Sequence, residues 1–119
     1  MATEEAMIAT AAAAIRHWEQ GNEQGYRSVM HANATMRIPA YGVDIQGINT
    51  IWGIRQMGGS SPLAIHTLHT AYVAGRTVIA LSTIYSRETG AITQHAELKY
   101  TFDDAGKIVL YEQDVLWKA

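Results

Sequence analysis

Four long strand-like runs fill the second half of this 119-residue chain and constrain its fold more than any other feature. They span residues 63–74, 76–87, 91–102 and 107–117. These runs are rich in Thr, Val, Ile and Tyr, which favour extended backbone. Short breaks that contain Gly75, Gly90 and Gly106 separate them, so the pattern predicts hairpin turns and an antiparallel meander. Strands of this length twist and curl, which predicts a strongly curved sheet.

The first half of the chain predicts three helices and one early strand. Apolar residues recur at helical spacing within residues 8–18, 26–30 and 48–52. Residues 35–40 alternate as a short strand with a proline near its end. Helices collected on one side of an antiparallel sheet make an α+β fold. We therefore expect a single domain over residues 1–119, in which a cone-shaped, mostly antiparallel sheet packs on three N-terminal helices and encloses a pocket.

The composition argues against several classes of function. A formal net charge of −2 and a pI near 6.2 leave no basic surface for nucleic acid. The absence of cysteine excludes disulfides and zinc–thiolate sites. Glu4 and Glu5 stand where a secretory signal has basic residues, and the next apolar stretch is too short to cross a bilayer, so we expect a cytoplasmic protein. Charged residues make up 17% of the chain, below the usual quarter, which points to a surface covered by a second subunit or turned toward a cavity.

The last two runs supply candidate polar residues for the pocket. Gln94, Leu98 and Tyr100 share the more apolar face of their run, so we place them inside with Ile92. In the last run we place Tyr111 and Gln113 inside, because burying the carboxylates that alternate with them would cost more. The amides and phenols of this set either bind a ligand within an apolar pocket or satisfy one another inside the core.

His66 and Arg55 are the charged or titratable candidates from the middle of the chain. Histidine titrates near neutral pH, so His66 is a candidate acid or base, or else it lies on the outer face of the sheet. His69 is three residues away and faces the opposite side of a strand, so we expect no metal site. Arg55 either binds a carboxylate or enolate in the pocket or extends to solvent. The predicted wall consists of Trp18, Tyr26, Ile38, Tyr41 and Trp52, with Tyr41 at the mouth.

Four short motifs, in this order along the chain, resemble those of the ketosteroid-isomerase-like families. The motifs are Gln20-Gly21-Asn22, residues 35–39, residues 47–51 and the hairpin at residues 104–109. The resemblance covers nearly the whole chain. It implies the cone-shaped fold shared by nuclear transport factor 2, ketosteroid isomerase and the SnoaL-like polyketide cyclases. It also implies a pocket for a small organic ligand and a homodimer formed through the outer face of the sheet.

The catalytic residues of ketosteroid isomerase do not carry over to this sequence. The position that resembles its general base holds Ile38, and two oxyanion-binding positions hold Ala14 and Leu98. Two further tyrosine positions hold Met30 and Arg55. Because that proton transfer needs a base and an oxyanion clamp, the resemblance does not imply ketosteroid isomerase activity itself.

The resemblance to SnoaL-like cyclases suggests a different acid or base, since those enzymes use an aspartate on the last strand. Ungapped counting places Gln113 at that position, with Asp114 one residue later. A one-residue β-bulge would turn Asp114 inward. Asp114 and His66 are therefore the two candidate catalytic residues.

These observations lead to one main expectation about function and to alternatives. We expect a SnoaL-like cyclase, isomerase or lyase that acts on a hydrophobic carbonyl-bearing metabolite without a cofactor. The alternatives are a protein that binds a hydrophobic ligand without changing it, and an accessory protein whose dimer surface matters more than its pocket. A titratable side chain inside the pocket favours the enzyme.

Overall fold

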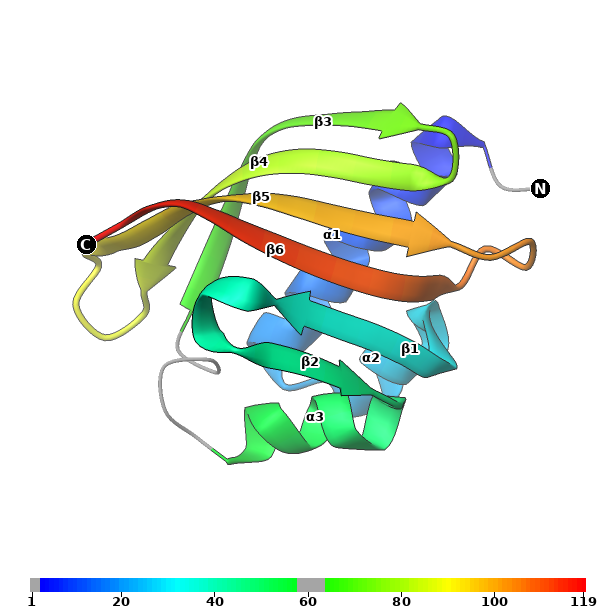
Figure 1. Cartoon of the computed structure of the whole chain (residues 1–119), viewed down its shortest axis with the longest axis horizontal. Coiled ribbons are helices and arrows are strands. Elements are labelled where there is room, and N and C mark those ends of the chain that lie inside the picture. The colour runs from blue at the N-terminus through cyan, green and yellow to red at the C-terminus, as the bar shows by residue number, and fades with distance from the viewer. Residues whose placement is uncertain (1–2, 58–63) are drawn as a thin grey trace.

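The computed structural model describes residues 3–57 and 64–119, and there it places a six-stranded sheet against three helices (Figure 1). The helices are α1 (Glu4–Gln20), α2 (Glu23–Val29) and α3 (Ile48–Gln56). The strands are β1 (Met30–Ile38), β2 (Val43–Gln46), β3 (Ala64–Ala74), β4 (Thr77–Ser86), β5 (Ile92–Phe102) and β6 (Ile108–Lys118), and a short 3₁₀ helix η1 (Pro39–Tyr41) precedes β2. The α+β prediction is confirmed. The predicted break at residues 58–62 lies outside the described residues.

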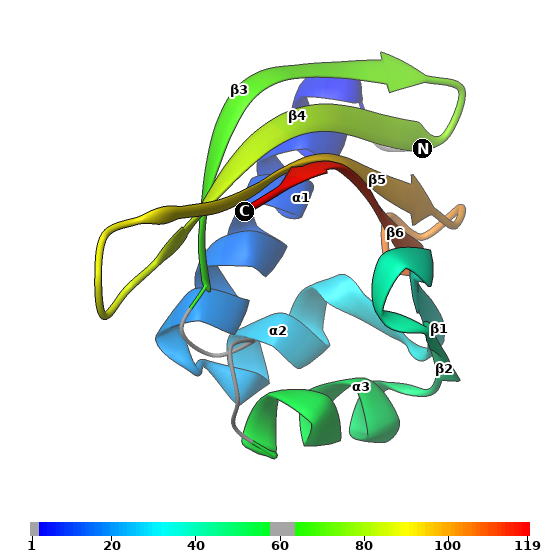
Figure 2. The same ribbon diagram turned by 60° about the vertical axis from the view of Figure 1, so that its left-hand side comes forward.

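The sheet is open and has the strand order β2-β1-β6-β5-β4-β3. Strands β3 to β6 form the predicted antiparallel meander, and β1 joins it parallel to β6 and antiparallel to β2. The long strands bend across α1, whereas α2 and α3 lie toward the β1–β2 end (Figures 1 and 2). The curvature predicted from strand length is therefore present, and the concave face of the sheet is turned toward the helices.

Helix α1 begins and ends where the sequence predicts. The Thr3 hydroxyl accepts a hydrogen bond from the backbone N–H of Ala6 at 3.1 Å, which caps the first turn. Gly21 ends the helix in the left-handed conformation, with a φ of 69°. The buried face of the helix consists of Met7, Ala11, Ala14, Ile15 and Trp18. This face joins the core beneath the sheet.

Strand β1 is longer than predicted, and the sequence pattern does not predict β2. β1 begins at Met30 rather than at residue 35, and its pairing with β6 is irregular between Met30 and Thr35. Residues 30–36 do alternate between apolar and polar types, but Ala32, Asn33 and Ala34 are residue types that are depleted in strands, so the stretch does not stand out as one. β2 has four residues, of which only Val43 and Ile45 are apolar, so its pattern is too short to recognise. It forms because β1 supplies its hydrogen-bond partners.

Register shifts in β3 and β5 decide which side chains face the concave side. In β3 the shift occurs around His69, so that His66 faces inward while Tyr72 is turned outward and is 54% exposed. A shift at the start of β5 leaves Ile92 41% exposed, and the prediction that Ile92 faces inward is wrong. A bulge inverts the side-chain alternation beyond it, which periodicity alone does not reveal.

Candidate ligand-binding cavity

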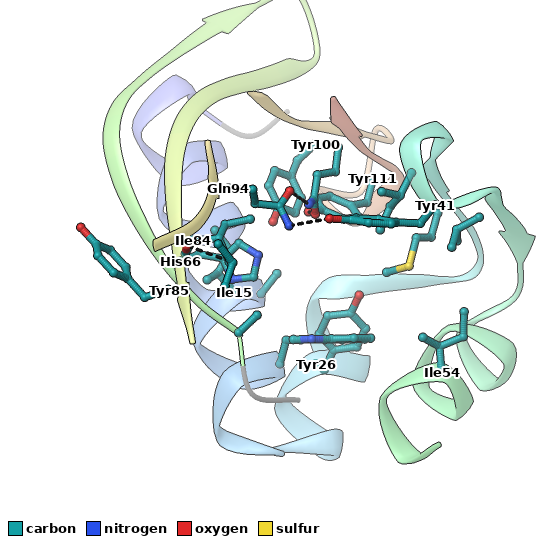
Figure 3. Close-up of a pocket in the computed structure, with 18 of the residues that line it drawn as sticks. Ile15, Tyr26, Tyr41, Ile54, His66, Ile84, Tyr85, Gln94, Tyr100 and Tyr111 are labelled. Carbon is teal, nitrogen blue, oxygen red and sulfur yellow. Dashed lines mark hydrogen bonds between the residues drawn. The ribbon is translucent and has the colours of Figure 1, made fainter. Parts of the chain in front are cut away.

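A cavity of about 400 Å³ lies between the helices and the concave face of the sheet (Figure 3). Its volume falls in the range of pockets that hold small organic molecules. The helices and the β1–β2 region contribute Ala14, Ile15, Trp18, Tyr26, Met36, Ile38, Tyr41, Val43 and Ile54 to its lining. Strands β3 to β6 contribute Ala64, His66, Ile84, Tyr85, Ser86, Thr93, Gln94, Tyr100, Tyr111 and Gln113. The walls are therefore mostly apolar, with a small number of polar groups.

Three aromatic rings pack together at the helical end of the cavity. The ring centroids of Trp18, Tyr26 and Trp52 lie between 5.3 and 5.7 Å from one another. Trp18 and Tyr26 line the cavity, whereas Trp52 packs against them outside its lining and is 3% exposed. Burial raises the pKa of the Tyr26 phenol well above its ordinary value. Figure 3 shows this hydroxyl pointing into the cavity, so Tyr26 offers a protonated donor there.

A chain of hydrogen bonds crosses the sheet side of the cavity and ends at Tyr41. The Tyr111 hydroxyl donates to Gln113 Oε1 at 2.7 Å, and Gln113 Nε2 donates to Gln94 Oε1 at 2.9 Å. Gln94 Nε2 then donates to the Tyr41 hydroxyl oxygen at 3.1 Å. The Tyr41 oxygen accepts this bond, so its own hydrogen is left to donate elsewhere. The amides and phenols thus satisfy one another and also line the cavity.

The buried phenols of the sheet are donors rather than bases. The rings of Tyr100 and Tyr111 lie 4.8 Å apart. Burial raises the pKa of both hydroxyls well above the ordinary tyrosine value. They remain protonated near neutral pH, so any base in the cavity must come from another side chain.

His66 brings a titratable side chain to the cavity wall, and it lies against Glu19 at the end of α1. Glu19 Oε1 accepts a hydrogen bond from the backbone N–H of His66 at 2.7 Å and lies 3.5 Å from His66 Nδ1. The side chains of His66 and Glu19 are 12% and 16% exposed. Burial disfavours the Glu19 carboxylate, but its contacts with the His66 side chain and backbone N–H and the nearby Arg87 guanidinium outweigh this, and its pKa is lowered.

Leu98 and Asp114 do not line the cavity. Leu98 is completely buried in the core. Asp114 lies on the outer face of the sheet, where its carboxylate is 3.4 Å from Lys99 Nζ and about half exposed. β6 does contain bulges, but the extra residues are Val109 and Leu116, which lie five residues before and two residues after Asp114. The predicted inward turn of Asp114 therefore does not occur, and Gln113 faces the cavity instead.

Arg55 contacts the end of α1 and does not line the cavity. Its Nε donates to the backbone carbonyl of Trp18, and its Nη2 donates to that of Glu19 at 3.3 Å. Its guanidinium also lies over the ring of Trp52, 5.4 Å from the centroid. Arg55 thus donates to carbonyl groups that a helix leaves without intrahelical partners at its C-terminus. It therefore neither binds a ligand in the pocket nor extends to solvent, the two roles that the sequence suggested.

Sequence reasoning missed Glu19, which the fold places next to His66. A carboxylate near the C-terminus of a helix is disfavoured by the helix dipole, and this unfavourable placement is the one signal that could have drawn attention to it. Ser86 and Thr93 also line the cavity, beside the turn that joins β4 to β5. No motif marks these two residues.

Residues 3–57 and 64–119 contain neither a cluster of metal-binding side chains nor a membrane-spanning helix. In this part of the chain, no three His, Cys, Asp or Glu side chains come together in a way that could hold a metal ion. His66 and His69 face opposite sides of β3, as their spacing predicts. No helix among the same residues has the length and apolarity needed to cross a membrane.

Comparisons with known proteins identify the fold. No family model matches the sequence, and no curated protein matches it. A candidate ketosteroid isomerase from Kribbella flavida superimposes with a TM-score of 0.81 at 9% identity, over 98% of this chain and 82% of that one. A candidate isomerase of the SnoaL-like family from Agrobacterium tumefaciens gives 0.77 at 12% identity, over 93% and 97% of the two chains. A candidate polyketide cyclase from Sinorhizobium meliloti gives 0.70 at 15% identity, over 88% and 93%.

At these identities the likeness concerns the fold alone. The chain has the cone-shaped fold of nuclear transport factor 2-like, ketosteroid isomerase-like and SnoaL-like proteins, as the sequence motifs predict. Ile38 and Ala14, at positions that resemble catalytic positions of ketosteroid isomerase, line the cavity as apolar side chains.

Proposed function

We propose that this protein is an enzyme of the cyclase, isomerase or lyase type that acts on a small hydrophobic molecule with a carbonyl group. The observation that carries the proposal is an apolar cavity in which His66 shares the wall with free hydroxyl donors. Candidate isomerases and a candidate polyketide cyclase are among the proteins with the same fold, which supports this class of reaction.

Hydroxyl groups from two sides of the cavity would hold the carbonyl oxygen. Tyr41 stands at the end of the donor chain that runs through Gln113 and Gln94, and each bond in such a chain polarises the next. Tyr26 presents its hydroxyl from the helical side (Figure 3). An oxygen that becomes negatively charged during the reaction accepts stronger hydrogen bonds from these donors than a neutral carbonyl does.

His66 would act as the acid and base. In an isomerisation, its imidazole takes the proton from a carbon next to the carbonyl, and the electron pair of that C–H bond forms the enolate. The imidazolium then returns the proton to a different carbon of the same substrate. No external oxidant or reductant is needed, because the proton and the electron pair both stay within the complex.

A binding protein is the second candidate, and the neutral character of most polar cavity groups favours it. Gln94 and Gln113 are buried and bonded to each other, and the tyrosines are protonated. Such groups orient a ligand without exchanging protons with it.

Ligand stabilisation tests both candidates. We expect at least one member of a panel of polycyclic ketones, polyketide-like aromatic ketones and fatty acids to raise the thermal midpoint. At a hundred times its dissociation constant, a ligand adds about 2.7 kcal/mol to the free energy of unfolding. This stability corresponds to a shift of several degrees for a domain of about this size.

Filling the cavity provides the control for this measurement. Ala14 lines the cavity from α1, so Ala14→Phe is expected to abolish the shift. Ala9 is exposed on the same helix, and Ala9→Phe should leave the shift intact. A thermal shift that persists in Ala14→Phe would mean that the ligand binds outside the cavity. If no compound of the panel shifted the thermal midpoint of the folded wild-type protein, that result would argue against both candidate functions.

We also propose a homodimer formed through the outer face of the sheet. Tyr72, Leu81 and Trp117 are between 43% and 54% exposed on β3, β4 and β6. We expect light scattering to give twice the chain mass of 13.1 kDa, and Leu81→Lys to restore the single-chain mass because it places a charge in an apolar contact. A monomeric wild-type protein at tens of micromolar would contradict this assembly.

A further inference from the structure

Glu19 lies at the C-terminal end of α1, where the helix dipole by itself disfavours a carboxylate. It is the residue before the last one of α1, and its side chain is only 16% exposed. Its backbone carbonyl accepts hydrogen bonds from Arg87 Nη2 at 2.7 Å and from Arg55 Nη2 at 3.3 Å. Its carboxylate accepts the backbone N–H of His66 at 2.7 Å. Both the backbone and the side chain of Glu19 are therefore fixed by groups from other elements.

The position of Glu19 determines which nitrogen of His66 carries the proton in the neutral ring. His66 Nδ1 is enclosed by protein atoms and forms no well-aligned hydrogen bond among the described residues, while Glu19 Oε1 lies 3.5 Å away. A lone pair on Nδ1 would face a carboxylate oxygen and be repelled by it, whereas an N–H would be attracted. The neutral ring is therefore expected to carry its hydrogen on Nδ1, with the lone pair on Nε2.

We propose that Glu19 is a positioning residue that holds His66 as the Nδ1–H tautomer and thereby makes Nε2 the base of the cavity. The catalytic role of Nε2 rests on the proposed function, because a base matters only if a proton is transferred in the cavity. When Nε2 takes a proton, the ring becomes an imidazolium next to the Glu19 carboxylate. The ion pair then stabilises the charge that the reaction creates on the ring.

Nitrogen-15 NMR tests the tautomer on the free protein, with no ligand present. Long-range ¹H–¹⁵N correlation spectra distinguish the two neutral tautomers, and the His66 signals are identified by their loss in His66→Gln. We expect His66 to show the Nδ1–H pattern in the wild type. A predominant Nε2–H pattern in the folded wild type would overturn the proposal.

Variants of Glu19 separate charge from packing. Glu19→Gln removes the charge at nearly constant size, and we expect His66 to shift toward the Nε2–H tautomer. Glu19→Asp keeps a carboxylate and should retain more of the wild-type pattern. Glu23→Gln is the matched control, because Glu23 is about half exposed and pairs with Arg27 on α2. An unchanged His66 spectrum in a folded Glu19→Gln protein would contradict the proposal.

A ligand that carries a hydroxyl group tests separately whether Glu19 helps His66 Nε2 to take up a proton. 2-Naphthol resembles an enol, and transfer of its hydroxyl proton to His66 Nε2 leaves a naphtholate whose absorbance differs from that of the neutral form. We expect the ratio of bound naphtholate to bound naphthol to fall about tenfold in Glu19→Gln, because the carboxylate that stabilises the imidazolium is removed. Naphthol that fails to bind would argue against the proposed function, and the tautomer measurement would still decide the role of Glu19. Naphthol that binds equally ionised in both proteins would contradict the role of Glu19.

Discussion

Leu98→Ala is expected to lower the free energy of unfolding by about 2–5 kcal/mol, because it removes a fully buried side chain and leaves a void. Leu98 lies on the concave face of β5 opposite Ala80 and Gln113. Ala80 is too small to fill the space that the leucine leaves, and the Gln113 amide is held by hydrogen bonds with Tyr111 and Gln94. Chemical denaturation followed by tryptophan fluorescence measures the change.

Leu116→Ala is the matched control for that measurement. Leu116 is a bulged residue of β6 and is 63% exposed, so the same substitution there should cost less than about 0.5 kcal/mol. A loss below 1 kcal/mol for Leu98→Ala would mean that position 98 borders open space, as a residue lining the ligand site would. Such a result would restore the prediction that Leu98 contacts the ligand.

The fold could be predicted largely because its strongest signals are local. Capping by Thr3 and the left-handed Gly21 depend on a few neighbouring residues, and α1 has the predicted ends. The four long strands are separated by glycine-containing turns, and the structure places them within one or two residues of the predicted ranges. β2 escaped prediction because its pairing partner, rather than its own sequence, makes it a strand.

The cavity could be predicted only in part, because side-chain direction depends on bulges. Alternation placed Gln94, Tyr100, Tyr111 and Gln113 on the concave face, and the structure places all four in the cavity lining. Alternation also allowed a bulge that would bring Asp114 inward, but periodicity does not show where a bulge falls, and the extra residues of β6 are Val109 and Leu116.

Contacts between segments that are far apart in the chain could not be predicted from the sequence, for a different reason. Glu19 and His66 are 47 residues apart, and neither belongs to a motif. Their contact depends on how the end of α1 meets the start of β3, which is set by packing of the whole core. The same is true of Arg55, whose partners lie 36 and 37 residues away.

His66→Gln is expected to lower kcat by at least about a hundredfold, the usual contribution of a general acid or base. The substrate for this measurement is the carbonyl compound that gives the largest thermal shift and is converted by the wild type. Glutamine keeps a polar side chain of similar size but cannot take up a proton at neutral pH. The ligand-induced thermal shift should therefore persist, so that the loss appears in kcat rather than in binding.

Asp114→Asn distinguishes this mechanism from one based on the last strand. Asp114 lies outside the cavity in a partly exposed contact with Lys99, so its replacement should leave kcat within about twofold and change stability by less than about 1 kcal/mol. If Asp114→Asn abolished turnover while His66→Gln did not, the acid or base would belong to β6, as in the cyclases that the sequence resembles. If neither change affected turnover, catalysis would depend on orientation by the cavity and its neutral donors. Because His66 and Asp114 lie on opposite faces of the sheet, a single pair of variants separates these mechanisms.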